Sequence, residues 1–281
     1  MFKVPSMNLA STLRHLVPAK GRREQEMPLV SIIMPAYNAA ATLKASIASV
    51  QSQTYPCWQL LVINDASTDA TAAIAGNLAA TDPRITLVNL PGNRGPVEAR
   101  NIGLDAAKGR FIAFLDADDV WYPTKLHWQV ETLQNTSAAL CCTSYELMDN
   151  NGKLLHKYRH VQARHYNYQD ILANNVIGCL TLMVDVSKTG PFQIPHVKTV
   201  AEDYACWLKL LRNGVTAVGI PEVLAVYRFT GNSRSSDKFH AAKGVWNVLR
   251  HNEKLPLTKA LWYFGHYAIL RSPRLFERRA A

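Results

Sequence analysis

Short apolar runs recur through the first half of the chain, each rich in β-branched or aromatic residues and each followed by polar residues. They cover residues 29–34, 59–64, 85–90 and 110–115. Strands that are buried on both faces of a parallel sheet have this continuous apolar character. Helical patterns lie between them, near 40–53, 70–81 and 96–107. The alternation predicts an α/β fold with a mostly parallel, doubly wound sheet flanked by helices.

The second half of the chain has a less regular pattern. It predicts strands at 138–148, 178–184 and 215–228, and helices at 124–134 and 203–213. The spacing there does not repeat the strand–helix–strand units of the first half. We expect this part to complete the same α/β domain with less regular elements.

The last part of the sequence, 239–271, indicates two helices separated near Pro256. Apolar residues recur at helical spacing at Leu257, Leu261 and Phe264, and Trp262 adds aromatic bulk. A helix that lies in a membrane interface has such a stripe beside basic residues. A helix that packs on its own domain has the same stripe, so both interpretations stay open.

Composition indicates a folded chain without an obvious membrane span. Of its 281 residues, 48% are hydrophobic and 19% are charged, which favours a packed core over disorder. No apolar run reaches the roughly 18 residues of a membrane-spanning helix, and the first residues lack the pattern of a secretion signal. The five cysteines form no Cys-x-x-Cys pair, which argues against a zinc site or disulfide framework and fits a reducing cytosol.

The net charge of +10 is carried by the two ends of the chain. Residues 1–26 contain five basic and two acidic side chains, and residues 238–281 contain nine basic and two acidic ones. We therefore expect a basic extension at 1–27, a central domain at 28–237 and a basic, aromatic helical extension at 238–281. Basic ends suit an anionic membrane surface or nucleic acid, although they also serve simply to keep a protein in solution.

Polar residues come directly after each of the first four predicted strands. Ligands of open α/β sheets bind beyond the carboxyl ends of the strands, so these residues converge on one edge. Tyr37 can stack on a base, Asp65 can accept hydrogen bonds from a base or ribose, and Arg94 can contact ribose or phosphate. Each also has an ordinary interpretation, as a half-buried tyrosine, a turn-forming aspartate or a solvated arginine.

Three carboxylates come after the fourth strand within four residues, at Asp116, Asp118 and Asp119. Such carboxylates repel one another unless a cation neutralises them. Their hard oxygen ligands suit Mg²⁺ or Mn²⁺, which commonly bridge to phosphate groups. The alternative is a polar turn in which one aspartate caps the next helix, but that accounts for one carboxylate and not for three.

A second acidic pair, Glu202-Asp203, opens the helical pattern at 203–213. Negative charge is stabilised at a helix N-terminus, which is a sufficient structural reason for acids at this position. The chemical interpretation is that one carboxylate acts as a general base toward an acceptor hydroxyl.

Taken together, these motifs resemble the family-2 inverting glycosyltransferases of GT-A fold. The resemblance covers roughly residues 28–236 and is most specific in three stretches. These are 30–38 (VSIIMPAYN), 99–103 (ARNIG) with 114–123 (FLDADDVWYP), and 201–208 (AEDYACWL). The chain contains no Arg-Trp pair, and the resemblance then implies the addition of a single sugar per binding event.

The resemblance also implies roles for individual residues. The nucleoside of the donor would be held by Pro35, Ala36, Tyr37, Asn38 and Asp65. The Asp116-Ala117-Asp118 stretch would contact the donor, with Asp116 near the ribose and Asp118 reaching a Mg²⁺ or Mn²⁺ ion on the diphosphate. Asp203 would be the catalytic base and Glu202 would support it.

The partners implied are a nucleotide-diphosphate sugar, with uridine diphosphate donors favoured, and a glycan or lipid-linked acceptor. No nucleic acid is expected. With the basic, aromatic ends, the resemblance favours a cytoplasmic enzyme at the inner face of a bacterial membrane that takes part in cell-surface polysaccharide assembly.

Three other functions use a similar fold and would leave different residues in the sequence. A sugar nucleotidyltransferase would carry a glycine-rich basic loop where this chain has residues 35–38. A dinucleotide-binding enzyme would carry Gly-x-Gly-x-x-Gly there. A non-catalytic nucleotide-sugar binding module on the same fold stays open, although it would more naturally have lost Asp118 or Asp203.

Overall fold

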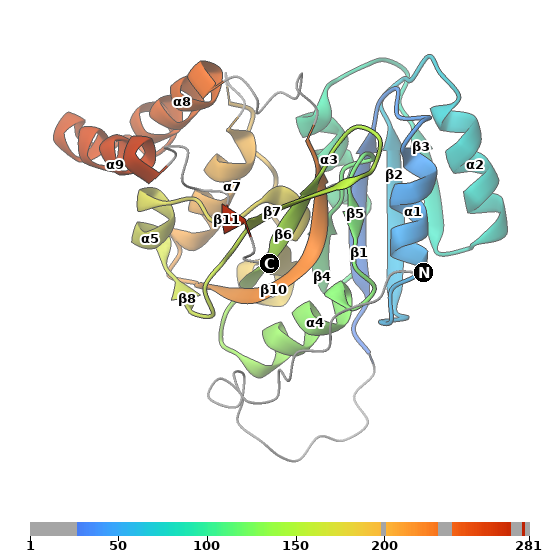
Figure 1. Cartoon of the computed structure of the whole chain (residues 1–281), viewed down its shortest axis with the longest axis horizontal. Helices are drawn as coiled ribbons and strands as arrows, with labels where there is room; N and C mark the ends of the chain where they lie inside the picture. Colours follow the sequence, from blue (N-terminus) through green and yellow to red (C-terminus); the bar gives the residue numbers. More distant parts are fainter. Residues whose placement is uncertain (1–26, 198–200, 230–237, 271–276, 279–281) are drawn as a thin grey trace.

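A computed structural model describes residues 27–197, 201–229, 238–270 and 277–278 (Figure 1). One continuous sheet runs through it, with helices on both faces. Its main path has the order β11-β7-β6-β9-β4-β1-β2-β3, and β10 pairs with β6 beside this path. The α/β fold predicted from the sequence is confirmed.

The first half of the chain forms the parallel part of the sheet. Its strands are β1 (Val30–Ala36), β2 (Trp58–Asn64), β3 (Ile85–Asn89) and β4 (Phe111–Phe114). They pair in parallel in the order β4-β1-β2-β3. β1, β2 and β4 are almost entirely buried, because helices cover both of their faces.

Alternate residues of β1 show how the two faces are covered. Ile32 belongs to the hydrophobic cluster that includes α1 (Leu43–Gln51), and Ile33 faces α3 (Pro96–Ala106) on the other side. A Cβ at Gly103 would lie 2.5 Å from Ile33 Cγ2, so only glycine lets α3 approach this closely. The third helix of this half, α2 (Thr71–Thr81), packs with α1.

The second half of the chain makes the sheet mixed. β6 (Leu140–Met148) and β9 (Met183–Asp185) run antiparallel to each other, β9 runs antiparallel to β4, and β10 (Ala217–Arg228) lies parallel to β6. The remaining strands are β5 (Val120–Trp121), β7 (Leu154–Arg159), β8 (His165–Tyr166) and β11 (Glu277–Arg278). The sheet is therefore a parallel block in its first half and is continued by an extension with both parallel and antiparallel pairs.

The helices of the second half agree with the sequence where a long pattern was present. α4 (Lys125–Asn135) and α7 (Glu202–Leu211) lie where helices were predicted. The short helices α5 (Tyr168–Ala173) and α6 (Val186–Thr189) were not predicted.

The strand predicted at 178–184 is a 3-10 turn, Cys179–Thr181, that leads into the short β9. Side chains hold the carbonyl groups of this turn in place of a ladder. Trp121 Nε1 donates to Leu180 O at 2.9 Å, and Gln129 Nε2 donates to Thr181 O at 2.8 Å.

The C-terminal part contains α8 (Lys238–Asn247), a π-helical turn (Val248–Asn252) and α9 (Leu257–Leu270). Buried Leu249 and Ala260 join the same hydrophobic cluster as α5 and α7. Glu253 accepts hydrogen bonds from Tyr168 and, at 2.6 Å, from Arg212. One face of these helices therefore packs on the domain.

The domain limits expected at 27/28 and 237/238 stay predictions, because residues 1–26 and 230–237 lie outside the described part of the chain. Among the residues that the structure describes, none of the helices is both long enough and apolar enough to cross a membrane.

Candidate functional site

A cleft of about 1250 Å³ opens at the carboxyl ends of β1, β2 and β4 and reaches the C-terminal helices α8 and α9. It brings together segments that are far apart in the sequence. Of the residues predicted for the site, those that line it are Pro35, Ala36, Tyr37, Asn38, Asp65, Asp116, Ala117, Asp118, Glu202 and Asp203. The convergence of strand ends expected from the sequence is thus present.

The loop after β1 is fastened to the loop after β2. Asn38 has a positive φ of 48°, a conformation that asparagine tolerates better than most residues. Its N–H donates to Ser67 Oγ at 3.0 Å, and its Oδ1 accepts from the N–H of Thr68 at 2.9 Å. The turn leaves Tyr37 at the cleft with 52% of its surface exposed, so its ring is accessible to a ligand.

Asp65 is 3% exposed and fixes the loop after β3. Its Oδ1 accepts from the N–H of Arg94 at 2.7 Å, and its Oδ2 accepts from the N–H of Gly95 at 2.8 Å. A carboxylate oxygen has a second lone pair, so Asp65 can still accept a bond from a ligand.

Arg94 is the predicted site residue that does not line the cleft. Its guanidinium is half exposed and lies 3.8 Å from Glu98. Asn93 and Gly95 line the cleft in its place. The contact of Arg94 with ribose or phosphate stays a prediction.

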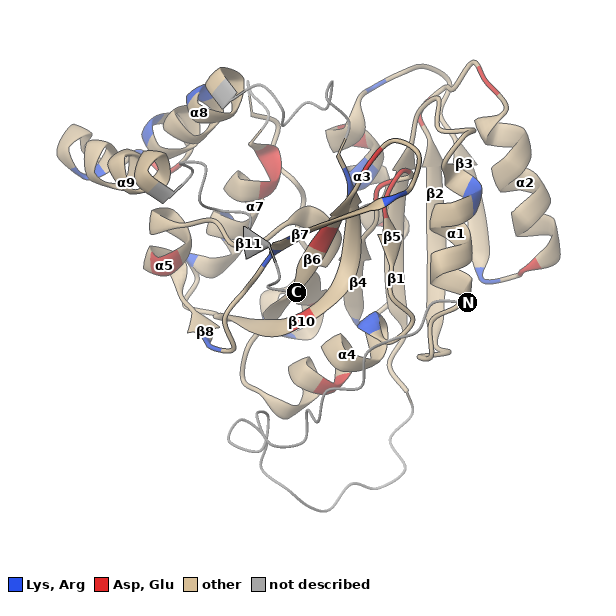
Figure 2. Ribbon diagram, in the orientation of Figure 1, with Lys and Arg blue, Asp and Glu red and all other residues tan. Residues whose placement is uncertain are grey.

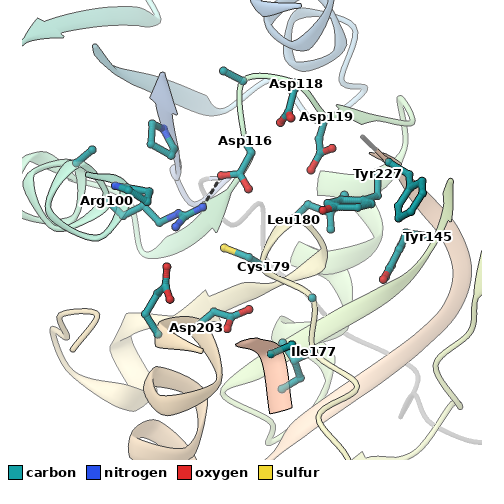
Figure 3. Close-up of a pocket in the computed structure, with 18 of the residues that line it drawn as sticks. Arg100, Asp116, Asp118, Asp119, Tyr145, Ile177, Cys179, Leu180, Asp203 and Tyr227 are labelled. Atoms are coloured by element: carbon teal, nitrogen blue, oxygen red, sulfur yellow. Dashed lines mark hydrogen bonds and ion pairs between the residues drawn. The ribbon is translucent and has the colours of Figure 1, made fainter. Parts of the chain in front are cut away.

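Asp116 is paired with a residue that the sequence pattern did not single out. Arg100 of α3 donates from Nη2 to Asp116 Oδ1 at 2.5 Å, and its side chain is 10% exposed (Figure 3). Burial alone would lower the pKa of Arg100, but the carboxylates of Asp116 and Asp203 more than compensate and hold it above its usual value. Arg100 could have been found from its place in the 99–103 motif, because it lies one turn after the start of α3, which begins near the ends of the strands.

Asp118 and Asp119 follow Asp116 in the same loop, and their carboxylates are largely shielded from solvent. Burial, and then the charge of Asp116, raises the pKa of Asp118. Asp119 is 1% exposed, and burial with the neighbouring carboxylates raises its pKa well above the usual value. Its Oδ1 accepts from the N–H of Arg228 at 2.8 Å, whereas Oδ2 has no hydrogen-bond partner among the described residues.

The guanidinium of Arg228 holds this loop from outside. Nε donates to Asp118 O at 2.9 Å, and Nη1 donates to Asn150 O at 2.9 Å. Arg228 therefore ties the loop after β4 to the β6–β7 hairpin.

The carboxylates fit a divalent cation that is shared with a ligand. No group of three or more acidic, histidine or cysteine side chains in the described ranges is arranged to enclose a metal by itself. Mg²⁺ and Mn²⁺ commonly take one or two carboxylates and complete their shell with phosphate oxygens and water. Asp116 and Asp118 can supply those carboxylates, and a cation would relieve the electrostatic cost of burying charge here.

Asp203 approaches from the opposite wall. It lies at the start of α7 and faces the Asp116–Asp119 side, with Cys179 of the 3-10 turn between them (Figure 3). Its Oδ1 accepts from the N–H of Tyr204 at 2.6 Å. Trp207, one turn further along α7, is fully buried with its ring centroid 6.0 Å from that of Phe114. Packing on β4 therefore fixes the helix that carries Asp203 relative to the strand that precedes Asp116.

The half of the cleft away from Arg100 is aromatic and apolar (Figure 3). Tyr145 and Tyr227 meet edge to face with centroids 6.1 Å apart, and Ile177 lies nearby (Figure 3). Phe264 and Tyr267 of α9 complete the far wall. This half suits a sugar face or an apolar chain more than it suits a phosphate group.

Comparison with known proteins identifies the family of the chain. The profile of Glycosyl transferase family 2 matches residues 31–188. The chain is 44% identical over 241 residues to the putative teichuronic acid biosynthesis glycosyltransferase TuaG of Bacillus subtilis (strain 168), covering 86% of this chain and 95% of that protein. It is 39% identical over 243 residues to the UDP-Glc:alpha-D-GlcNAc-diphosphoundecaprenol beta-1,3-glucosyltransferase WfgD of Escherichia coli, covering 86% and 93%.

Solved structures show the same fold at low sequence identity. S. aureus TarS 1-349 in complex with UDP-GlcNAc superposes with a TM-score of 0.65 at 17% identity, covering 86% of this chain and 72% of that one. The mannosyltransferase PcManGT from Pyrobaculum calidifontis, in complex with GDP-Man and Mn²⁺, gives 0.63 at 19% identity, covering 87% and 74%. The GT-A fold expected from the sequence is confirmed, and with the family match and the two curated relatives it shows that the chain belongs to glycosyl transferase family 2 and is a glycosyltransferase.

Proposed function

We propose that this enzyme transfers one sugar from a nucleotide-diphosphate donor, most naturally a UDP-sugar, to a hydroxyl group of a glycan or lipid-linked acceptor in bacterial polysaccharide assembly. One observation carries the proposal: a single cleft places the carboxylates after β4 opposite the carboxylate of Asp203. The names of the relatives support the substrate classes, since WfgD is named for UDP-Glc and a diphosphoundecaprenol acceptor.

In this proposal the donor lies across the strand ends. Tyr37 stacks on the base, and Asp65 accepts a hydrogen bond from the base or ribose. Asp116 and Asp118 would hold a Mg²⁺ or Mn²⁺ ion. When bound, that ion supplies positive charge that stabilises the developing charge on the departing nucleoside diphosphate. The donor sugar then lies near Cys179, between Asp116 and Asp203.

Asp203 acts as general base on the acceptor hydroxyl. The hydroxyl loses its proton to the Asp203 carboxylate, and its oxygen forms a bond to the anomeric carbon. The bond from that carbon to the diphosphate oxygen breaks with both electrons leaving on the diphosphate. One displacement from the opposite face inverts the anomeric configuration, and Glu202 supports Asp203 from the same helix start.

The acceptor enters over the aromatic half of the cleft. Tyr145 and Tyr227 offer ring faces to the acceptor sugar, and Phe264 and Tyr267 offer apolar surface to the lipid that this sugar is attached to. A lipid-linked acceptor places the reaction at the inner face of the cytoplasmic membrane.

The test is a panel of UDP-, GDP- and dTDP-sugars with Mn²⁺, read first by thermal stabilisation and then by transfer to a diphosphate-lipid acceptor. One class of nucleotide sugar should stabilise the protein, EDTA should abolish transfer, and NMR should show an inverted anomeric carbon. Asp118→Asn should abolish transfer, whereas Glu131→Gln, a matched change at an exposed carboxylate outside the cleft, should not. Retention of configuration, or full transfer in EDTA, would refute the proposed mechanism.

A further inference from the structure

Helix α9 is apolar on two opposite faces. Tyr263, Phe264 and buried Ala260 pack on the domain. The other face leaves four large apolar side chains in solvent, which we name the α9 outer face: Leu257 (55% exposed), Leu261 (54%), Trp262 (66%) and Ile269 (75%). At 3.6 residues per turn these four fall within roughly 140° of the helix circumference, so they form one surface.

An exposed apolar surface of this kind indicates a binding partner. Single exposed apolar residues are ordinary on a protein, whereas a contiguous set that includes tryptophan marks a contact site. Trp262 is also held in place, because its ring lies 4.7 Å from that of His266 on the next turn. An ordered tryptophan beside leucine and isoleucine is typical of the depth at which an interfacial helix enters a bilayer.

The exposed charged residues of α8, α9 and the turn between them are of one sign: within residues 239–269 they are Lys243, Lys254 and Lys259. Figure 2 shows basic positions on α8 and α9, and the acid that it shows on the neighbouring α5, Asp170, is paired with Arg164 at 3.1 Å. The acid in this stretch, Glu253, has a side chain that is 1% exposed and bound to Arg212. An apolar surface with a cationic surround complements an anionic lipid surface. Two copies of this chain would instead bring like charges together.

The same helices form a wall of the active-site cleft. Ala241 of α8, and Phe264 and Tyr267 of α9, line the cleft from the inner side. The α9 outer face and the apolar half of the cleft are thus two sides of one helical layer. A bilayer in contact with the outer face would lie beside the end of the cleft that takes the acceptor.

We infer that the α9 outer face, with Lys254 and Lys259, docks this glycosyltransferase on an anionic lipid bilayer so that the cleft meets the acceptor at the membrane surface. The inference rests on the proposed lipid-linked acceptor for its purpose, but the contact itself requires no sugar transfer. The basic segments 1–26 and 271–281, which lie outside or mostly outside the described residues, are identical in the wild type and in every variant of the test.

Flotation of the full-length protein with phosphatidylcholine vesicles, with and without phosphatidylglycerol, tests the contact. The wild type should float with the anionic vesicles. Leu261→Gln combined with Trp262→Gln, and separately Lys254→Glu combined with Lys259→Glu, should each lower the bound fraction roughly tenfold. Lys108→Glu, an exposed change in the loop before β4 and outside the cleft, should float like the wild type and serves as the control.

Thermal stabilisation by the nucleotide sugar, unchanged in each variant, would show that the fold and donor site are intact. Flotation of both double variants at the wild-type level would overturn the inference. So would a wild type that dimerises by light scattering through a contact that Trp262→Gln abolishes, since a second copy would then occupy the face. If the wild type does not float but transfers a sugar to a water-soluble acceptor, the docking proposal alone is refuted. If the wild type floats but transfers no sugar, the proposed function alone is refuted.

Discussion

At the scale of single residues, Arg100 connects the two chemical halves of the cleft. Its guanidinium contacts Asp116 directly and lies close enough to Asp203 to be influenced by its charge. A buried arginine in this position orients one carboxylate and sets the field felt by the other. We regard it as a positioning residue, because its direct contact is with Asp116 and not with a substrate.

Arg100→Lys tests this role while retaining the positive charge. A lysine cannot reproduce the planar fork, so we expect kcat/KM to fall by about 10²-fold. The melting temperature should change by only a few degrees. Arg84→Lys, at an ion pair away from the cleft, is the matched control and should remain active. Unchanged kcat/KM in Arg100→Lys would contradict the role.

Some site residues were predictable because they come directly after strands. Tyr37, Asp65, Asp116 and Asp118 each stand just beyond an apolar run, and the rule for open α/β sheets brings them together. Arg100 and Cys179 reach the cleft through a helix turn and a 3-10 turn, and local spacing does not fix where such residues point. Arg94 shows the converse, because its main chain serves the site while its side chain turns toward Glu98.

At the scale of elements, α3 joins the donor side to the segment that precedes Asp203. Asn101, the neighbour of Arg100, donates from Nδ2 to Ile194 O at 2.9 Å and accepts from the N–H of Ile194 at 2.8 Å. Both residues are buried. One helix thus contacts Asp116 and also holds the chain shortly before α7.

Asn101→Ala should weaken the attachment of the segment around Ile194, which precedes α7 and Asp203. The loss of two buried hydrogen bonds leaves main-chain groups unpaired and should cost about 1–3 kcal/mol of unfolding free energy. We expect kcat to fall while the affinity for the nucleotide sugar stays near the wild-type value, because the side chain of Asn101 bonds to Ile194 and does not line the cleft. Equal losses in kcat and donor affinity would argue against this division. Asn77→Ala, an exposed change on α2, is the control.

Helix α4 contains a lysine, Lys125, and lysine side chains are almost always exposed to solvent. Lys125 is fully buried instead, with Nζ 2.5 Å from Gln129 Oε1 and 3.8 Å from the centroid of the Trp121 ring. Gln129 and Trp121 also hold the 3-10 turn that lines the cleft. Amphipathic periodicity assigns a lysine to solvent, so this network could not be predicted from the pattern.

The buried Lys125 predicts a particular dependence of stability on pH. Burial lowers its pKa to about 7 in the folded protein, whereas the unfolded chain titrates near its ordinary pKa of about 10.4. Between these values the unfolded state binds the extra proton, so the unfolding free energy rises with pH by at most about 1.4 kcal/mol per unit. Below about pH 7 both states are protonated and this gain is absent.

Lys125→Met should remove that rise. Denaturant unfolding of both proteins at pH 6.5, 8 and 9.5 gives the difference in unfolding free energy directly. We expect the variant to be the more stable protein at pH 6.5, with its advantage shrinking as pH increases. A difference that stays constant from pH 6.5 to 9.5 would contradict a depressed pKa for Lys125.

At the scale of the whole molecule, the parallel part of the sheet carries the loops that we propose bind the donor, and the mixed part carries the surface that we propose binds the acceptor. The parallel strands and their helices were predictable, because each strand–helix–strand unit is local in sequence. The pairing of β6 with β9 and β10 was not, since those strands meet across long separations and their short partners β5 and β8 carry no pattern of their own. The arrangement of the second half of the chain therefore could not be predicted from the sequence and is known from the structure alone.

The central claim is that Asp203 completes one active site with the carboxylates after β4. The most direct measurement is sugar transfer by Asp203→Asn, made alongside calorimetric binding of the nucleotide sugar. The amide can still accept from the N–H of Tyr204, so the start of α7 should be preserved. We predict donor affinity close to the wild-type value with turnover lower by about 10²–10⁴-fold. Turnover near the wild-type rate, with donor binding intact, would contradict the claim.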